Sequence, residues 1–248
     1  MYYVLQPLRV LWKIYFFLFF ILTLTVFYPL FRWGLAKRER FPLAYKFMRY
    51  WSWWVLTLVG IRMRRIQKGV EPEAPFIICP NHSSYLDIIT MCRVFKNYVV
   101  FMGKMEILTW PMFNVFFNTG MNISVDRSSM KGAKNAYDLA KEALQRGESI
   151  VLFPEGTIPN GAPELGPFKN GAFKLAKEME VPILPVTFID NVNRLQAGAA
   201  LRVKGGPGPS RVVIHEAIMP DQIRSMTMSE LKRNTFDIIK KPLDQNGD

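Results

Sequence analysis

The chain has 248 residues, is 50% hydrophobic and carries a formal net charge of +12. This length can bury one sizeable core and does not require two catalytic domains. The charge is uneven, because residues 1–70 hold 12 Lys and Arg against one acidic residue, whereas residues 71–248 hold 20 against 19. A nucleic-acid-binding protein needs its basic stripe on the folded domain, so a nearly neutral C-terminal part argues against nucleic acid as a partner.

Two apolar segments occupy the N-terminal quarter of the chain. Residues 14–31 carry no charge and are about 18 residues long, near the lower limit for a helix that spans a bilayer. No small-residue cleavage site follows, which argues against a cleaved secretory signal. Residues 50–61 are too short to span alone, and their three tryptophans favour the headgroup zone. We predict a two-helix membrane anchor over residues 1–68, lying in one face of the membrane, with a single crossing by the first helix as the alternative.

The remaining residues, 69–248, are predicted to form one catalytic domain. Short apolar runs alternate there with helical patterns, of which residues 130–145 form the clearest amphipathic helix and residues 229–240 a closing helix. Strands separated by helices predict an α/β fold, a mostly parallel sheet flanked by helices. The predicted strands are Phe76–Cys79, Tyr98–Met102, Ile123–Val125, Ser149–Phe153, Ile183–Thr187, Ala200–Val203 and Val212–His215.

The two cysteines, Cys79 and Cys92, give no sign of a disulfide framework, since Cys79 lies in a predicted core strand. A reducing, cytoplasmic environment fits this. Together with two histidines they leave little from which to build a zinc site, so we expect no metal.

The step from His82 to Asp87 carries the clearest chemistry. His82 lies on the turn between a predicted strand and a predicted helix, and Asp87 lies in the first turn of that helix, where a carboxylate reaches back toward the helix start. Imidazole is the side chain best suited to take a proton near neutral pH, and a carboxylate at its other nitrogen fixes its tautomer. The spacing fits equally a carboxylate that only caps the helix and a histidine that only fills the turn. His215, inside an apolar strand, is predicted to be a sheet residue.

Two further polar patches follow predicted strands, where α/β folds place their sites. One strand runs into Pro154-Glu155-Gly156-Thr157, and another runs into Asp126-Arg127-Ser128. An arginine and free backbone amides at a helix start both favour phosphate, so Arg127 is a candidate anion ligand. Each patch also has a simpler explanation, in which Glu155 pairs with a lysine and Arg127 with Asp126.

These blocks, in this order, resemble the glycerolipid acyltransferases, and most closely the bacterial 1-acylglycerol-3-phosphate acyltransferase family. The resemblance rests on four blocks that cover about residues 76–190: Asn81-His82-Ser83-Ser84-Tyr85-Leu86-Asp87, Gly120 with Asp126-Arg127, Phe153-Pro154-Glu155-Gly156-Thr157, and Val181-Pro182-Ile183-Leu184-Pro185-Val186. The hydrophobic two-helix leader also agrees with the architecture of that family.

The resemblance implies an O-acyltransferase that makes phosphatidic acid from lysophosphatidic acid. His82, aligned by Asp87, would take the proton of the acceptor hydroxyl, which attacks the thioester of acyl-CoA or an acyl carrier protein; no further cofactor is expected. The resemblance also implies a substrate-binding role for Glu155, Gly156 and Arg127. The other candidate substrate-binding residues are Asn81, Lys104, Thr157 and Lys169.

One residue departs from the family pattern, because Ile158 follows Thr157 where the third block commonly ends in arginine. Lys169 could supply the positive charge of that arginine. A lyso-aminolipid acceptor is therefore the alternative substrate, and a membrane lipid-binding protein without activity or a thioesterase is the alternative function. The expected location is the cytoplasmic face of the inner (plasma) membrane, with the bilayer, a lysophospholipid acceptor and the acyl donor as partners.

Overall fold

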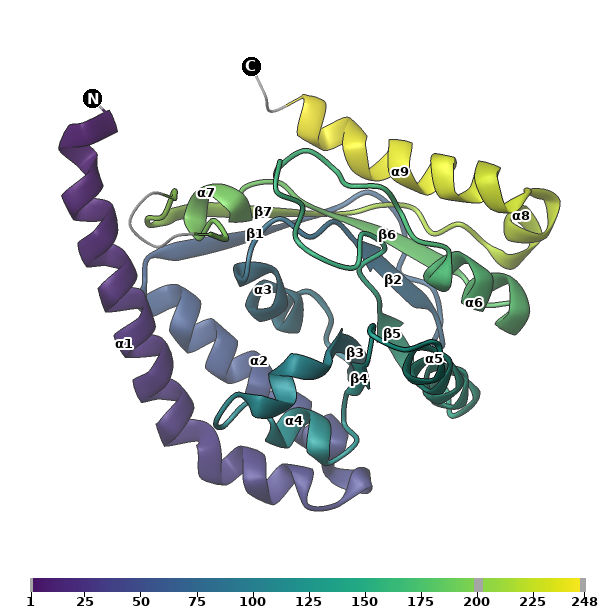
Figure 1. Ribbon diagram of the computed structural model, residues 1–248, viewed down its shortest axis with the longest axis horizontal. Helices are drawn as coiled ribbons and strands as arrows, with labels where there is room; N and C mark the ends of the chain where they lie inside the picture. Colours follow the sequence, from purple (N-terminus) through teal and green to yellow (C-terminus); the bar gives the residue numbers. More distant parts are fainter. Residues whose placement is uncertain (1, 199–202, 246–248) are drawn as a thin grey trace.

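The computed structural model describes residues 2–198 and 203–245, in which one mixed sheet lies between two layers of helices (Figure 1). Within these residues the strands form a seven-stranded sheet in the order β1-β7-β6-β2-β5-β3-β4. All neighbouring strands pair in parallel except β6 and β7, which are antiparallel. The strands are β1 (Ile61–Gln67), β2 (Ile77–Pro80), β3 (Val99–Lys104), β4 (Ile123–Val125), β5 (Ser149–Val151), β6 (Ile183–Phe188) and β7 (Gly208–Ile214).

The helices divide between the two faces of the sheet, and each layer has its own buried core. One face carries α1 (Tyr2–Leu35), α2 (Phe41–Leu58), α3 (Leu86–Val94) and α4 (Val115–Asn118), and the other carries α5 (Met130–Gln145), α6 (Gly171–Met179), α8 (Pro220–Ser225) and α9 (Met228–Asp244). The short helix α7 (Asn191–Arg194) follows β6, and two 3-10 turns, Arg38–Arg40 and Met105–Thr109, connect elements. This arrangement confirms the predicted α/β class.

Most predicted elements occur within two or three residues of their expected bounds, and the amphipathic helix over residues 130–145 begins and ends where it was predicted. Its start is set by Ser129, whose hydroxyl accepts from the Gly132 amide at 3.0 Å. The predicted strand Ala200–Val203 falls on residues outside the described part of the chain, except for Val203, which is not in a strand.

The strand β1 was not predicted, and it lies on the anchor side of the division expected between residues 68 and 69. It pairs along its whole length with β7, from Ile61 opposite Gly208 to Gln67 opposite Ile214. Three of the five exposed positions of Ile61–Gln67 carry arginine, so the segment lacks the short apolar run by which the other strands were predicted. That division into two domains remains a prediction, but the last part of the expected anchor belongs to the sheet.

The two N-terminal helices pack on the body and on each other. One stripe of α1 is buried at Phe16, Leu24 and Phe31, while Phe31 packs edge-on against Trp51 of α2 at 6.0 Å between ring centroids. The opposite stripe is exposed and apolar: Leu8, Leu11, Ile14, Phe17, Leu18, Ile21, Leu22, Val26 and Leu30. Within the described residues, α1 is the one helix long and apolar enough to cross a membrane. An exposed apolar surface of this length indicates membrane association.

Candidate active site

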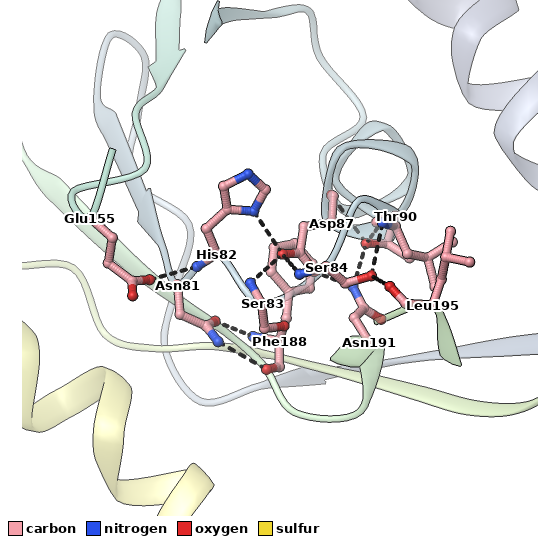
Figure 2. Close-up of polar contacts among 11 residues, drawn as sticks. Asn81, His82, Ser83, Ser84, Asp87, Thr90, Glu155, Phe188, Asn191 and Leu195 are labelled. Carbon is pink, nitrogen blue, oxygen red and sulfur yellow. Dashed lines mark hydrogen bonds and ion pairs between the residues drawn. The ribbon is translucent and has the colours of Figure 1, made fainter. Parts of the chain in front are cut away.

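The histidine and the carboxylate of the sequence prediction meet at the carboxyl end of the central strand β2 (Figure 2). Pro80 ends β2, and the chain turns before α3 begins at Leu86, so His82 lies outside the helix while Asp87 lies in its first turn. His82 Nδ1 is 2.9 Å from Asp87 Oδ2. The predicted contact is therefore present, and the explanation in which His82 only fills the turn does not account for it.

The carboxylate of Asp87 is fully buried and surrounded by donors. Its Oδ2 accepts from the backbone amides of Ser83 at 2.7 Å and Ser84 at 2.9 Å, in addition to the His82 ring. Its Oδ1 accepts from the Asn191 side-chain amide at 2.8 Å. An ionised carboxylate is an acceptor only, so Nδ1 of His82 donates in this contact, and in the neutral ring the lone pair belongs to Nε2.

The imidazole ring is held from a second side by Phe153. Its centroid lies 4.2 Å from that of the Phe153 ring, with the two planes tilted by 30°. The His82 side chain is 17% exposed, whereas Asp87 is fully buried. Figure 2 shows Nε2 on the edge of the ring that points away from Asp87. With the ring neutral, Nε2 is therefore the nitrogen that faces away from Asp87 and can accept a proton, which is the arrangement that a general base requires.

Glu155 supports the same turn from the loop after β5. Its Oε1 accepts from the His82 backbone amide at 2.7 Å, and its Oε2 accepts from the Gly166 amide at 2.7 Å. The side chain is buried, and burial raises the pKa of this carboxyl, an effect that its backbone hydrogen bonds oppose. The described contacts of Glu155 include no lysine, so the simpler explanation of an ion pair is wrong. The predicted contact of Glu155 with substrate stays a prediction; the contacts shown position His82.

Three of the predicted anion ligands lie around the same loop. Arg127 donates to the carbonyl oxygen of Gly156, and a methyl group added to Gly156 would lie 2.9 Å from Lys169 Nζ. Lys104 ends β3, where its Cα pairs with Val125, two residues before Arg127. The cations are exposed to solvent, as is Thr157. Exposed cations that follow neighbouring strands favour an anion nearby, and the phosphate-binding role of these residues stays a prediction.

The predicted pair of Arg127 with Asp126 is absent among the described contacts. Asp126 instead accepts from the Ser128 amide at 2.9 Å, the Ser128 hydroxyl at 2.6 Å and the Ser129 hydroxyl at 2.8 Å. These hydrogen bonds hold the pKa of the Asp126 carboxyl below its usual value. Arg127 is thereby left to turn toward Gly156.

Asn81 has a structural task. Its side-chain amide is buried, donates to the Phe188 carbonyl at 3.1 Å and accepts from the Phe188 amide at 2.7 Å, and so joins the ends of β2 and β6. The predicted substrate contact of Asn81 stays a prediction, and these bonds leave its side chain facing the protein rather than an opening.

Sequence reasoning missed Asn191, which contacts Asp87 from the start of the short helix α7 that follows β6. It is fully buried and lies 104 residues further along the chain. A polar residue after a predicted strand on the site edge of the sheet was the available signal. His215, predicted to be a sheet residue, is buried but lies directly after the end of β7; its Nε2 is 2.8 Å from the Thr187 hydroxyl, and burial lowers its pKa to about 4.

Known proteins resemble the chain in both sequence and fold. It is 26% identical over 211 residues to a probable 1-acyl-sn-glycerol-3-phosphate acyltransferase of Mycoplasma genitalium, covering 81% of this chain and 76% of that one. It is 29% identical over 166 residues to the 1-acyl-sn-glycerol-3-phosphate acyltransferase of Helicobacter pylori, covering 66% and 68%. The crystal structure of the 1-acyl-sn-glycerophosphate (LPA) acyltransferase PlsC from Thermotoga maritima superposes with a TM-score of 0.77 at 21% identity, covering 97% of both chains, and so has the same fold.

The sequence model of one family, described as acyltransferase, matches residues 62–189, which is more than half of the chain. The match includes all of β1 after its first residue, the His82–Asp87 dyad, Arg127 and the Glu155 loop. The chain is therefore an enzyme that belongs to the acyltransferase family.

Proposed function

We propose that the protein is a 1-acyl-sn-glycerol-3-phosphate O-acyltransferase, which transfers an acyl chain from acyl-CoA or an acyl carrier protein to the free hydroxyl of lysophosphatidic acid. The product is phosphatidic acid. The observation that carries this proposal is the 2.9 Å contact between His82 Nδ1 and the buried Asp87 carboxylate, which leaves Nε2 free as a base. The names of the Mycoplasma and Helicobacter relatives support the acceptor.

The reaction follows from the protonation of the dyad. His82 Nε2 takes the proton of the acceptor hydroxyl as its oxygen attacks the thioester carbonyl carbon. Asp87 stabilises the imidazolium that forms, and the protonated ring then gives its proton to the leaving thiolate when the carbon–sulfur bond breaks. The acyl group passes directly between the substrates, so the protein supplies no nucleophile and no resident cofactor is needed.

The acceptor head group would lie on the cations around Gly156. Arg127 offers a planar fork that suits phosphate, and the Lys169 ammonium adjoins the same glycine. Lys104 adds positive charge from the end of the neighbouring strand β3. We expect Thr157, exposed on the same loop, to add a hydroxyl to this seat. Ile158 keeps a lyso-aminolipid as the second candidate acceptor, because in the family pattern that the sequence resembles an arginine is common at this position.

The apolar stripe of α1 would place this site at a bilayer surface. Because Phe16, Leu24 and Phe31 pack on the body along much of the helix, α1 could not cross a membrane without drawing the body in with it. We therefore propose insertion into one leaflet, at the cytoplasmic face of the inner membrane, where lysolipid and a soluble acyl donor can both reach the site. Replacing exposed Leu18 and Leu22 by glutamate should release the full chain into the soluble fraction; continued sedimentation with vesicles would contradict this orientation.

The decisive test is a purified-enzyme assay of His82→Ala with several lysolipids, using acyl-CoA and acyl carrier protein as donors. We expect loss of transfer in His82→Ala and unchanged transfer in His215→Gln, which alters the other histidine and serves as the matched control. Retained transfer in folded His82→Ala would remove the proposed base. If the wild-type enzyme released free fatty acid instead of forming an acylated lysolipid, it would be a thioesterase. If it transferred the acyl chain to a lyso-aminolipid alone, that lipid would replace lysophosphatidic acid as the proposed acceptor.

A further inference from the structure

A buried polar chain continues from the dyad away from the substrate side. It runs from Ser210 of β7 through Asn191 to Asp87 and the His82 ring (Figure 2 shows its Asn191–Asp87–His82 part). Ser210, Asn191 and Asp87 are each fully buried. The side-chain links are short, with 2.6 Å from Ser210 Oγ to Asn191 Oδ1 and 2.8 Å from Asn191 Nδ2 to Asp87 Oδ1.

The neighbours of Asn191 fix which way its amide faces. Asp87 can only accept a hydrogen bond, so the atom facing it must be Nδ2. Thr90 gives the same answer, because its hydroxyl donates to the Leu86 carbonyl at 3.0 Å and accepts from Asn191 Nδ2 at 3.0 Å. If the Asn191 amide were flipped, its Oδ1 would face Asp87 Oδ1, and two acceptors would then meet. In the observed orientation, Asn191 Oδ1 instead accepts from the Ser210 hydroxyl. The orientation is therefore determined by the chemistry of its contacts.

The two oxygens of Asp87 have different supports. Oδ2 is held by two backbone amides of its own turn and by His82, whereas Asn191 Nδ2 is the donor that the described contacts give to Oδ1. Because the carboxylate is planar, fixing Oδ1 sets its rotation, and this rotation sets the direction in which Oδ2 faces His82 Nδ1. A buried acceptor left without a donor is costly, so loss of Asn191 would favour rotation or protonation of the carboxylate.

We propose that Asn191 is a positioning residue of the acyl transfer, which acts on His82 through Asp87 and is itself aligned by Ser210. Asn191 is fully buried, so we expect it to contact neither substrate, and its removal should lower kcat and leave the KM values for acceptor and donor within about twofold. In metal sites, the outer partners that orient a histidine contribute about 10- to 100-fold, and we expect an effect of similar size here. The inference rests on the proposed function, because it assumes that the neutral, Nδ1-protonated form of His82 is the base.

The test compares Asn191→Leu, which keeps a similar shape without a donor, with Thr235→Val as the control. Thr235 is also fully buried, but its hydroxyl donates to the Leu231 carbonyl at 2.8 Å within α9. We expect kcat about 10- to 100-fold lower in Asn191→Leu and unchanged in Thr235→Val. Ser210→Ala should lower kcat less, and the Ser210→Ala/Asn191→Leu double variant should be no slower than Asn191→Leu, because both act through one chain.

A spectroscopic readout separates positioning from a loss of fold. The full-length protein has two histidines, so ¹⁵N labelling gives two ring systems, with His215 as internal reference and His82→Ala for assignment. In the wild type we expect neutral His82 to be protonated mainly at Nδ1, and in Asn191→Leu a mixture of both tautomers. If Asn191→Leu does not fold, kcat and the His82 tautomer are measured on the milder Ser210→Ala variant instead, and these two measurements decide whether the buried chain positions His82.

Two results would overturn the positioning role of Asn191: a wild-type kcat in folded Asn191→Leu, or a reduced kcat with an unaltered His82 tautomer. If His82→Ala is inactive, either result leaves the proposed function standing. Activity retained in His82→Ala would overturn the proposed function and this inference together.

Discussion

Substitution of Asp87 by asparagine tests the electrostatic part of the dyad. The amide has the shape of the carboxylate, and its oxygen can still accept from His82 Nδ1 and from the Ser83 and Ser84 amides that now meet Oδ2. Its amino group would have to face Asn191, which can restore a hydrogen bond by turning its own amide over. The local fold therefore has a way to survive, and the main loss is the negative charge opposite the imidazolium.

The size of that loss follows from the geometry. A carboxylate 2.9 Å from a ring nitrogen stabilises a positive charge there by about 4–6 kcal/mol at an effective dielectric constant of about 20. Each 1.36 kcal/mol is about tenfold in rate, so kcat should fall about 10³- to 10⁴-fold. Both partners are largely withdrawn from solvent, with side-chain exposures of 17% and 0%, which keeps screening by water small.

The assay is thiol release from acyl-CoA at saturating lysophosphatidic acid, with a thiol reagent as reporter. The protein's own thiols should not interfere, since Cys79 and Cys92 are buried and burial raises the pKa of both, that of Cys92 to about 12. Thermal unfolding monitored by circular dichroism serves as the control for folding. A folded Asp87→Asn enzyme with kcat within about tenfold of the wild type would refute the assignment of Asp87 as the partner of the imidazolium.

Other measurements test the rest of the site and the fold. Arg127→Ala should raise KM for lysophosphatidic acid about tenfold and change kcat less, as for the loss of a charged hydrogen bond; an unchanged KM in steady-state kinetics would favour a head group without phosphate. Gly156→Ala should destabilise the protein by about 1–2 kcal/mol in urea unfolding, because φ is +73° and the added methyl would press on a lysine ammonium, whereas Gly171→Ala, with open space around it, should not. Burial lowers the pKa of His215 to about 4, so as the pH falls the unfolded chain binds a proton at this histidine before the folded chain does. Stability should therefore fall by up to about 3 kcal/mol as the pH drops from about 6.5 toward 4, and His215→Gln should reduce that dependence; equal slopes in urea titrations across this range would contradict it.

The dyad could be predicted because its geometry is local. Asp87 lies five residues after His82, and Pro80 marks the end of the strand before this turn in the sequence. Helix α5 was equally accessible, since its amphipathic pattern and its cap both lie within one segment.

The features that escaped prediction depend on contacts between distant segments. Asn191 meets Asp87 only because β6 lies beside β2, and nothing near residue 191 in the sequence indicates that neighbour. Similarly, β1 is an edge strand whose partner β7 follows about 140 residues later, and charged side chains are tolerated along it because its outer edge faces solvent. The task of Asn81 also depends on such a neighbour, the backbone of Phe188.

The pairing of β1 with β7 has a consequence for anyone who wishes to exchange the N-terminal region between relatives. The helix α2 leads through Val59 and Gly60 directly into the sheet edge, and the Trp12 indole of α1 donates to the Val59 carbonyl at 3.0 Å. A graft joined at residue 68 would bring in a foreign edge strand together with the foreign helices. Chimeras should therefore join ahead of Ile61 and carry matching residues at the helix–body contacts, or else transplant the helices and both paired strands as one unit.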